Sequence, residues 1–175
     1  MACSLTTGRK VPCKSAVGGI KAVYFADYGT LGAATIVSGE ITALAGTPVW
    51  YQFDVKGNTS LETAINSSRE NGTTFYESTL TLALTFQDKA TQEELKLIAH
   101  ARPHVAVEDY NGNFFLVGLE HGAEVTGGSI ATGAAMGDLS GYNLTVVGQE
   151  TAPPYFVLST VITDDASATQ IDPTA

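Results

Sequence analysis

Three histidines are the residues best suited to metal binding or acid–base chemistry. His100 and His104 stand four positions apart, a spacing that on one helix face would direct two imidazoles at one metal ion, and His121 could supply a third ligand. Pro103 breaks a helix between the first two, and the glutamate of a His-Glu-x-x-His site is missing. The sequence therefore predicts no metal site, and His100 is better explained as a favourable charge at a helix C-terminus.

Other reactive residue types also lack the arrangement that catalysis needs. Glu108, Asp109 and Glu120 could act as paired carboxylates, but they flank a predicted hairpin, where a solvated face is the better interpretation. The glycines between residues 127 and 141 match neither a dinucleotide-binding nor a phosphate-binding loop, and no Lys or Arg follows them. No serine lies in a Gly-x-Ser-x-Gly motif. We therefore expect neither a catalytic centre nor a cofactor.

The two cysteines, Cys3 and Cys13, both lie near the N-terminus. Their spacing does not match the paired ligands of a structural zinc site. They could close a small disulfide, but a reducing compartment would keep them as thiols, and two free thiols is the preferred interpretation.

Charge changes sign along the chain. Residues 103–175 contain nine carboxylates and neither Lys nor Arg, whereas residues 1–21 contain no carboxylate and four cations: Arg9, Lys10, Lys14 and Lys21. The whole chain carries a net charge of −9, which repels phosphate backbones and argues against sequence-specific binding of DNA or RNA. In a monomer the polarity only adds solubility, but in a self-assembling protein it lets a basic arm contact an acidic neighbour.

The length of 175 residues and the hydrophobic fraction of 44% fit one packed domain. We expect an N-terminal arm over residues 1–19, a single domain over 20–162 and an acidic tail over 163–175. No stretch approaches the roughly 20 apolar residues of a membrane helix, and the first residues lack the pattern of a secretion signal. We therefore expect an intracellular protein without a membrane segment.

Apolar residues at every second position predict mostly strands. The pattern is strongest over residues 73–86, where Leu80, Leu82 and Leu84 share one face. Asn111-Gly112 favours a tight hairpin turn, and residues 29–47 favour a long flexible hairpin. A last apolar run covers 155–162. The further predicted strands are 20–27, 48–56, 104–110, 113–120, 124–132 and 141–148.

One helix is expected, over about residues 90–101. Leu95 and Ile98 have helical spacing, Thr91 and Glu94 fit a capping box, and Pro103 ends the helix. A mainly β chain with one helix between two groups of strands predicts an antiparallel β-sandwich or partly open barrel with one flanking α-helix.

Trp50 lies on the opposite face of its predicted strand from Val49, Tyr51, Phe53 and Val55. It therefore either contacts another subunit or packs under a loop. If the chain self-assembles, we expect the interface to contain the four basic residues of the arm region and apolar residues of the long hairpin with Trp50: Arg9, Lys10, Lys14, Lys21, Leu31, Ile36, Ile41, Leu44 and Trp50.

The order of these elements resembles that of tail tube proteins of tailed bacteriophages. The segment NGNFFLVGLEHGAEVTGGSIATGAAMGDLSGYNLTVVGQE, residues 111–150, is also similar to small phage virion proteins. The resemblance implies a β-sandwich with a flanking helix, six copies in a ring, and stacked rings that conduct DNA without binding its sequence. It also implies a location in the virion tail after assembly in the host cytoplasm, with copies of itself and other tail or connector proteins as partners.

Two alternatives stay open. Head–tail joining, tail completion and capsid decoration proteins are a close alternative, since head–tail joining proteins share much of the same fold. A β-sandwich module that binds glycans or peptides is the alternative from another class, because four aromatic residues could stack on a ligand: Trp50, Tyr51, Phe75 and Tyr110.

Overall fold

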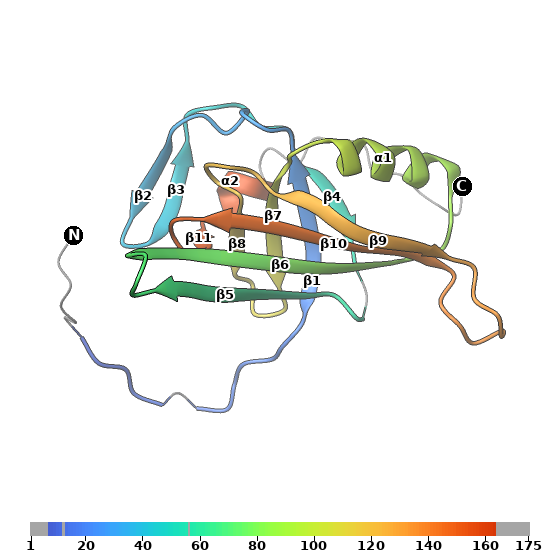
Figure 1. The fold of residues 1–175 in the computed structure, drawn as a ribbon, viewed down its shortest axis with the longest axis horizontal. Coiled ribbons are helices and arrows are strands. Elements are labelled where there is room, and N and C mark those ends of the chain that lie inside the picture. Colours follow the sequence, from blue (N-terminus) through green and yellow to red (C-terminus); the bar gives the residue numbers. More distant parts are fainter. Residues whose placement is uncertain (1–6, 12, 56, 164–175) are drawn as a thin grey trace.

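Two stacked β-sheets form the body of the protein in the computed structural model, which describes residues 7–163 apart from 12 and 56 (Figure 1). The large sheet has the strand order β2-β3-β11-β8-β7-β1-β4, and the small sheet has the order β5-β6-β10-β9. The fold is therefore mainly β and sandwich-like, as the sequence predicts. The strands are β1 (Ile20–Ala26), β2 (Ala34–Val37), β3 (Glu40–Leu44), β4 (Tyr51–Asp54), β5 (Ser60–Ser68), β6 (Thr73–Thr85), β7 (His104–Asp109), β8 (Phe114–Val117), β9 (Glu124–Ala131), β10 (Gly141–Glu150) and β11 (Tyr155–Val157).

The first core fills the space between the two sheets. Alternate residues of each strand point into it, because successive side chains of a strand face opposite sides of the sheet. The predicted face of β6 is confirmed, since Leu80, Leu82 and Leu84 are all buried there. The side chains opposite come from β1 and β7: Val23, Phe25, Val105 and Val107.

Helix α1 (Lys89–His100) packs against this core through its buried Leu95. Its N-cap is Asp88, whose Oδ2 accepts a hydrogen bond from the Thr91 backbone N–H at 3.0 Å. The predicted capping box at Thr91 is therefore wrong by one helical turn, because a stronger capping residue stands three positions earlier. Ala101 is extended and Pro103 follows, so the helix ends as predicted.

A second core covers the other face of the large sheet. Ala22 and Tyr24 of β1 and Leu116 of β8 point into it, while Val23, Phe25 and Val117 point into the first core. The last apolar run divides into β11 and a short helix, α2 (Ser159–Thr163), whose Ile162 is completely buried in this core. The central strands β1, β7 and β8 of the large sheet therefore contribute to a core on each face.

Strand β11 gives the large sheet its one parallel pair among the described strands. It runs antiparallel to β8 but parallel to β3, with Val157 beside Ile41. Parallel neighbours need a long connection, here the chain from β3 to β11. The sheet is thus antiparallel, as expected, except at this pair.

The predicted hairpin over 29–47 consists of β2 and β3. Ser38 and Gly39 form its two-residue turn with φ values of 53° and 87°, the positive values that a type I′ turn requires. At its base, Gly46 N–H donates to Leu31 O at 2.9 Å. A Cβ at Gly46 would lie 1.9 Å from Thr30 O, so only glycine fits this close approach.

Candidate assembly interface

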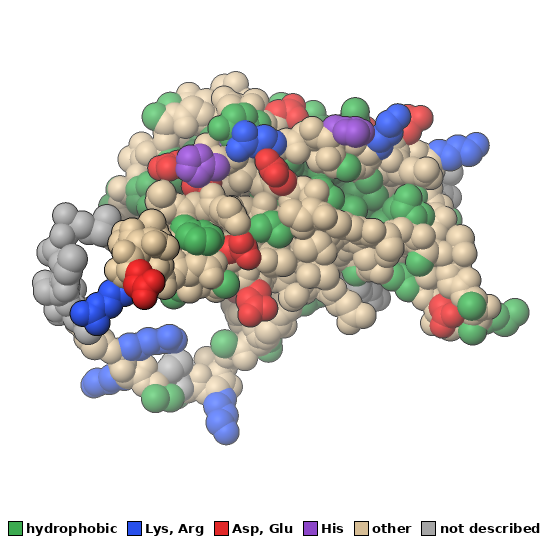
Figure 2. Space-filling model, in the orientation of Figure 1, with side chains coloured by type: hydrophobic (Ala, Val, Ile, Leu, Met, Phe, Trp, Pro, Cys, Tyr) green, Lys and Arg blue, Asp and Glu red, His purple; other side chains and the backbone are tan. Residues whose placement is uncertain are grey.

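The basic arm runs away from the body of the molecule. Residues 7–11 and 13–19 are all exposed, and Figure 2 shows Lys and Arg side chains spaced along them. Within the described residues, no hydrogen bond joins residues 7–16 to the sheets. Arg9, Lys10 and Lys14 are therefore free to meet a partner, whereas Cys3 and the predicted tail beyond residue 163 lie outside the described residues.

The root of the arm is attached to the turn between β7 and β8. Val17 N–H donates to Asn111 Oδ1 at 2.9 Å, and Asn111 Nδ2 donates to Val17 O at 2.7 Å. Asp109 holds this turn by accepting from the backbone N–H groups of Asn111 and Asn113. Burial alone would raise the pKa of Asp109, but hydrogen bonds from Asn113 and Asn111 outweigh it and lower the pKa. The arm thus leaves the body from a fixed point.

Lys21 pairs with a buried carboxylate of its own chain. Its Nζ lies 2.6 Å from Glu108 Oε1, and Tyr24 OH donates to Glu108 Oε2 at 3.0 Å. The hydrogen bond and charge of Glu108 raise the pKa of Lys21, while burial first and Glu108 second raise the pKa of Tyr24. Glu108 is only 8% exposed, so its predicted solvated face is wrong. It lies on the face of β7 that the second core covers, where a carboxylate needs partners.

Three predicted interface residues belong to the second core. Leu31, Ile41 and Trp50 are 2%, 0% and 1% exposed, so they cannot contact another subunit while this fold persists. For these three residues the prediction is wrong, because their side chains fill the second core of their own chain. Trp50 also cannot stack on a glycan. Ile36 is exposed and Leu44 is half-buried.

The three histidines do not come together within the described residues. His100 is exposed in the last turn of α1, His104 is buried in β7, and His121 is exposed on the turn before β9. The one group of three possible metal ligands in the described part of the chain is Glu120, His121 and Glu150, whose ligand atoms lie within 4.8 Å of one another.

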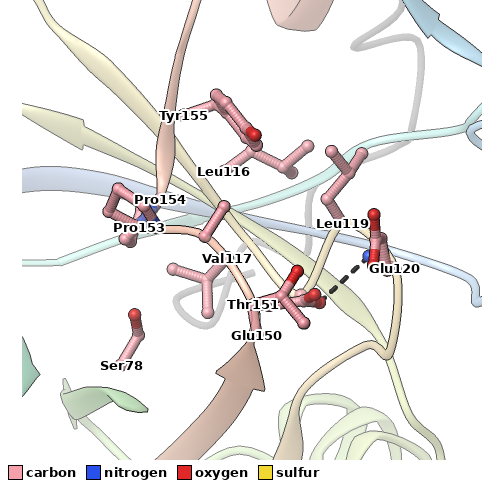
Figure 3. Close-up of a pocket in the computed structure, with 12 residues that line it drawn as sticks. Ser78, Leu116, Val117, Leu119, Glu120, Glu150, Thr151, Pro153, Pro154 and Tyr155 are labelled. Carbon is pink, nitrogen blue, oxygen red and sulfur yellow. Dashed lines mark hydrogen bonds between the residues drawn. The ribbon is translucent and has the colours of Figure 1, made fainter. Parts of the chain in front are cut away.

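Glu150 in this group already serves a structural purpose. Its Oε1 accepts hydrogen bonds from the backbone N–H groups of Glu120 and His121, each at 2.9 Å. Arg102 Nη2 donates to His121 O at 2.6 Å, which brings a cation to the same turn. Figure 3 shows Glu150 reaching Glu120 at the edge of a small cleft, beside Leu116, Val117 and the two prolines 153 and 154. The cluster holds the turn between β8 and β9 in place.

His104 of β7 joins the segment that follows β1 to the segment that follows β8. Its Nδ1–H donates to Gly118 O, and its Nε2 accepts from Gly29 N–H at 3.0 Å, which requires the neutral imidazole. Tyr28 stacks on the His104 ring with 5.2 Å between the two ring centroids. Arg102 in turn lies over the Tyr28 ring, 5.3 Å from its centroid. Burial lowers the pKa of His104 against weaker raising effects of Gly118 and Glu150.

We expect His104 to make the protein less stable in acid. Its pKa is lower in the folded chain than in the unfolded chain, where it is near 6.5, so the unfolded state binds the proton first. Stability is complete above about pH 6.5 and falls as the pH drops towards the folded pKa. Melting temperatures between pH 5 and 8 should show a slope that His104→Asn removes and His100→Asn, at an exposed site, retains. Equal slopes in all three proteins would contradict this role.

An aromatic cleft opens between β4, the end of β6 and α1. Three of its apolar side chains are exposed to solvent: Tyr51 by 43%, Phe86 by 55% and Leu97 by 62%. Phe86 has φ = 70°, an uncommon value for a residue with a bulky side chain, and its N–H donates to Ser140 O at 2.8 Å. Among the residues that the structure describes, those that line the cleft include Asp27, Asp54 and Glu94 but no Lys or Arg.

This cleft and the arm lie at opposite ends of β1. The arm enters β1 at Ile20, whereas Phe25 and Ala26 at the other end of the strand line the cleft (Figure 1). The cleft could not be located from the sequence alone, because it combines residues near positions 26, 53, 86 and 97. The signal that was visible, a basic arm on an acidic chain, gave one half of the arrangement.

The comparisons with known proteins add no relative. The chain matches no protein-family model, no curated protein and no solved structure. Within the described residues, the helices are all too short or too polar to cross a lipid bilayer.

Proposed function

We propose that the protein is a structural subunit that assembles with copies of itself, most specifically a tail tube subunit of a tailed bacteriophage. The observation that supports it is the arm: residues 7–11 and 13–16 are exposed, basic and without hydrogen bonds to the described sheets. Residues 20–163 contain six Lys and Arg against fifteen Asp and Glu, so the arm and the body have opposite charges. Such charges attract one molecule to the next.

The ends of the small sheet offer a way to close a ring. β5 and β9 are its edge strands, nine and eight residues long, and edge strands present unpaired backbone groups. Pairing β5 of one subunit with β9 of the next would join the small sheets into one continuous barrel. The resemblance to tail tube proteins implies six subunits in such a ring and rings stacked into a tube.

The acidic charge suits a channel that DNA passes through. A basic wall would bind phosphates and release counterions, which would retain the DNA, whereas an acidic wall repels it. In this function the protein needs no catalytic residue, no cofactor and no metal, and its partners are its own copies and neighbouring virion proteins.

Electron microscopy of the purified protein tests this function. At high concentration and low salt we expect rings and tubes in negative stain and fast-sedimenting species in the centrifuge. Rings that never stack would instead support a head–tail joining, tail completion or capsid decoration protein. A monodisperse monomer at every concentration and salt would contradict self-assembly altogether.

A further inference from the structure

We propose that the aromatic cleft between β4 and α1 binds the basic arm of a second copy of this chain. The inference rests on the proposed function, because it names the surface on which the arm of an assembling subunit docks. It requires two features that the structure places apart: a free arm at one end of β1 and an acidic, apolar cleft at the other.

The cleft has the composition of a docking surface. Tyr51, Phe86 and Leu97 leave apolar area open to water, and removing that area from water is favourable by about 25 cal/mol per Å². Aromatic rings also attract cations placed over their faces. A segment that carries both apolar and cationic side chains would therefore bind there.

The arm carries both kinds of side chain. Val11 is almost completely exposed, and it stands between Lys10 and the next described cation, Lys14. No carboxylate occurs in residues 1–19, whereas the described lining of the cleft includes Asp27, Asp54 and Glu94 and neither Lys nor Arg. Residues 164–175 have the wrong charge for this surface, since their ionisable side chains are three aspartates.

The positions of the two features favour a neighbour over the same molecule. The arm is held at Val17 beside the turn of β7 and β8, so it starts at the far end of β1 from the cleft. Each subunit then offers one arm and one cleft, a head-to-tail contact that closes into a ring or continues as a polymer. An arm of ten extended residues reaches roughly 33 Å, so its own cleft is an alternative that the experiment must separate.

Disulfide trapping tests the contact with a cysteine that the arm already has. Cys13 is an exposed free thiol, so we would replace Cys3 by Ser and introduce Leu97→Cys in the cleft. On mild oxidation we expect a ladder of covalent oligomers on a non-reducing gel. The matched control is Val37→Cys, which is similarly exposed on β2 and should give only the background seen without a new cysteine. Equal ladders, or a fast-migrating disulfide-linked monomer, would overturn the proposal.

Charge reversal then tests the chemistry. The pair Asp54→Lys and Glu94→Lys should reduce trapping by Leu97→Cys about tenfold, a change that corresponds to roughly 1.4 kcal/mol. Adding Arg9→Glu, Lys10→Glu and Lys14→Glu should restore it. The control pair is Glu70→Lys and Glu93→Lys, two exposed carboxylates outside the lining of the cleft, in the turn after β5 and on α1. If the glutamates in the arm do not restore trapping to the protein with lysines in the cleft, the proposed attraction between the arm and the cleft is refuted.

The results also separate this inference from the proposed function. Tubes or rings without trapping at Leu97→Cys would overturn the arm-to-cleft contact while the structural function stands. Specific trapping without rings or tubes would support the contact and contradict the tail tube function.

Discussion

A chain without residues 2–16 should fold normally and lose its ability to polymerise. The described part of this segment has no hydrogen bond to the sheets, and both cores consist of residues from 20 onwards, so its removal exposes no core. If each subunit contact loses 1.4 kcal/mol or more, the concentration needed for polymer rises at least about tenfold. Sedimentation over a salt series would measure the polymer, and circular dichroism would confirm the fold.

The matched variant keeps the arm and removes only its charge. Replacing Arg9, Lys10 and Lys14 by Gln should leave a weaker polymer than that of the intact chain but a stronger one than that of the deletion, because Val11 remains. Equal polymer from all three proteins would exclude the arm from assembly. Loss of the β-sheet signal in the deletion would instead show that the arm belongs to the core.

Trp50→Ala should destabilise the protein by about 3–5 kcal/mol, the range for removing a large buried side chain. Trp50 is 1% exposed in the second core, so the substitution leaves a cavity between the large sheet and its cover. Its Nε1–H is buried and has no hydrogen-bond partner among the residues that the structure describes. Trp50→Phe should therefore cost much less than Trp50→Ala, since Phe keeps most of the apolar contact and removes an unsatisfied donor.

Urea unfolding followed by circular dichroism would measure these free energies. The control is Tyr51→Ala, the neighbouring residue, which is 43% exposed and should lose far less stability. A loss below about 1 kcal/mol for Trp50→Ala, which is ordinary for a surface position, would show that Trp50 is not part of a packed core.

The elements that could be predicted are those with a long, regular pattern. β6 extends over thirteen residues with leucines at alternate positions in its second half, and α1 has both helical spacing and a proline beyond its end. The N-cap was placed wrongly because Thr91 fits a capping box, whereas Asp88, the stronger capping residue, takes the N-cap position. Local patterns thus identified the element but not its first turn.

The second core was missed because a sandwich was expected to bury one face of each sheet. β1 carried the missing signal: Ala22, Val23, Tyr24, Phe25 and Ala26 are consecutive and all buried. An unbroken apolar run of this length is typical of a strand covered on both faces. The second core also explains why Glu108, Leu31 and Trp50 are buried, since residues distant in sequence pack over each of them.

The position of β11 also sets the order in which the chain can complete its fold. In the large sheet, β3 and β8 are both paired with β11, so the hairpin of β2 and β3 joins the other strands only through residues 155–157. A nascent chain can form the hairpins β5–β6 and β7–β8 early, because their strands are close in sequence. It cannot close the large sheet until β11 has left the ribosome, nor finish the second core before Ile162 follows. A subunit of this fold thus cannot complete its large sheet before residues 155–162 have been synthesised, long after the basic arm has emerged.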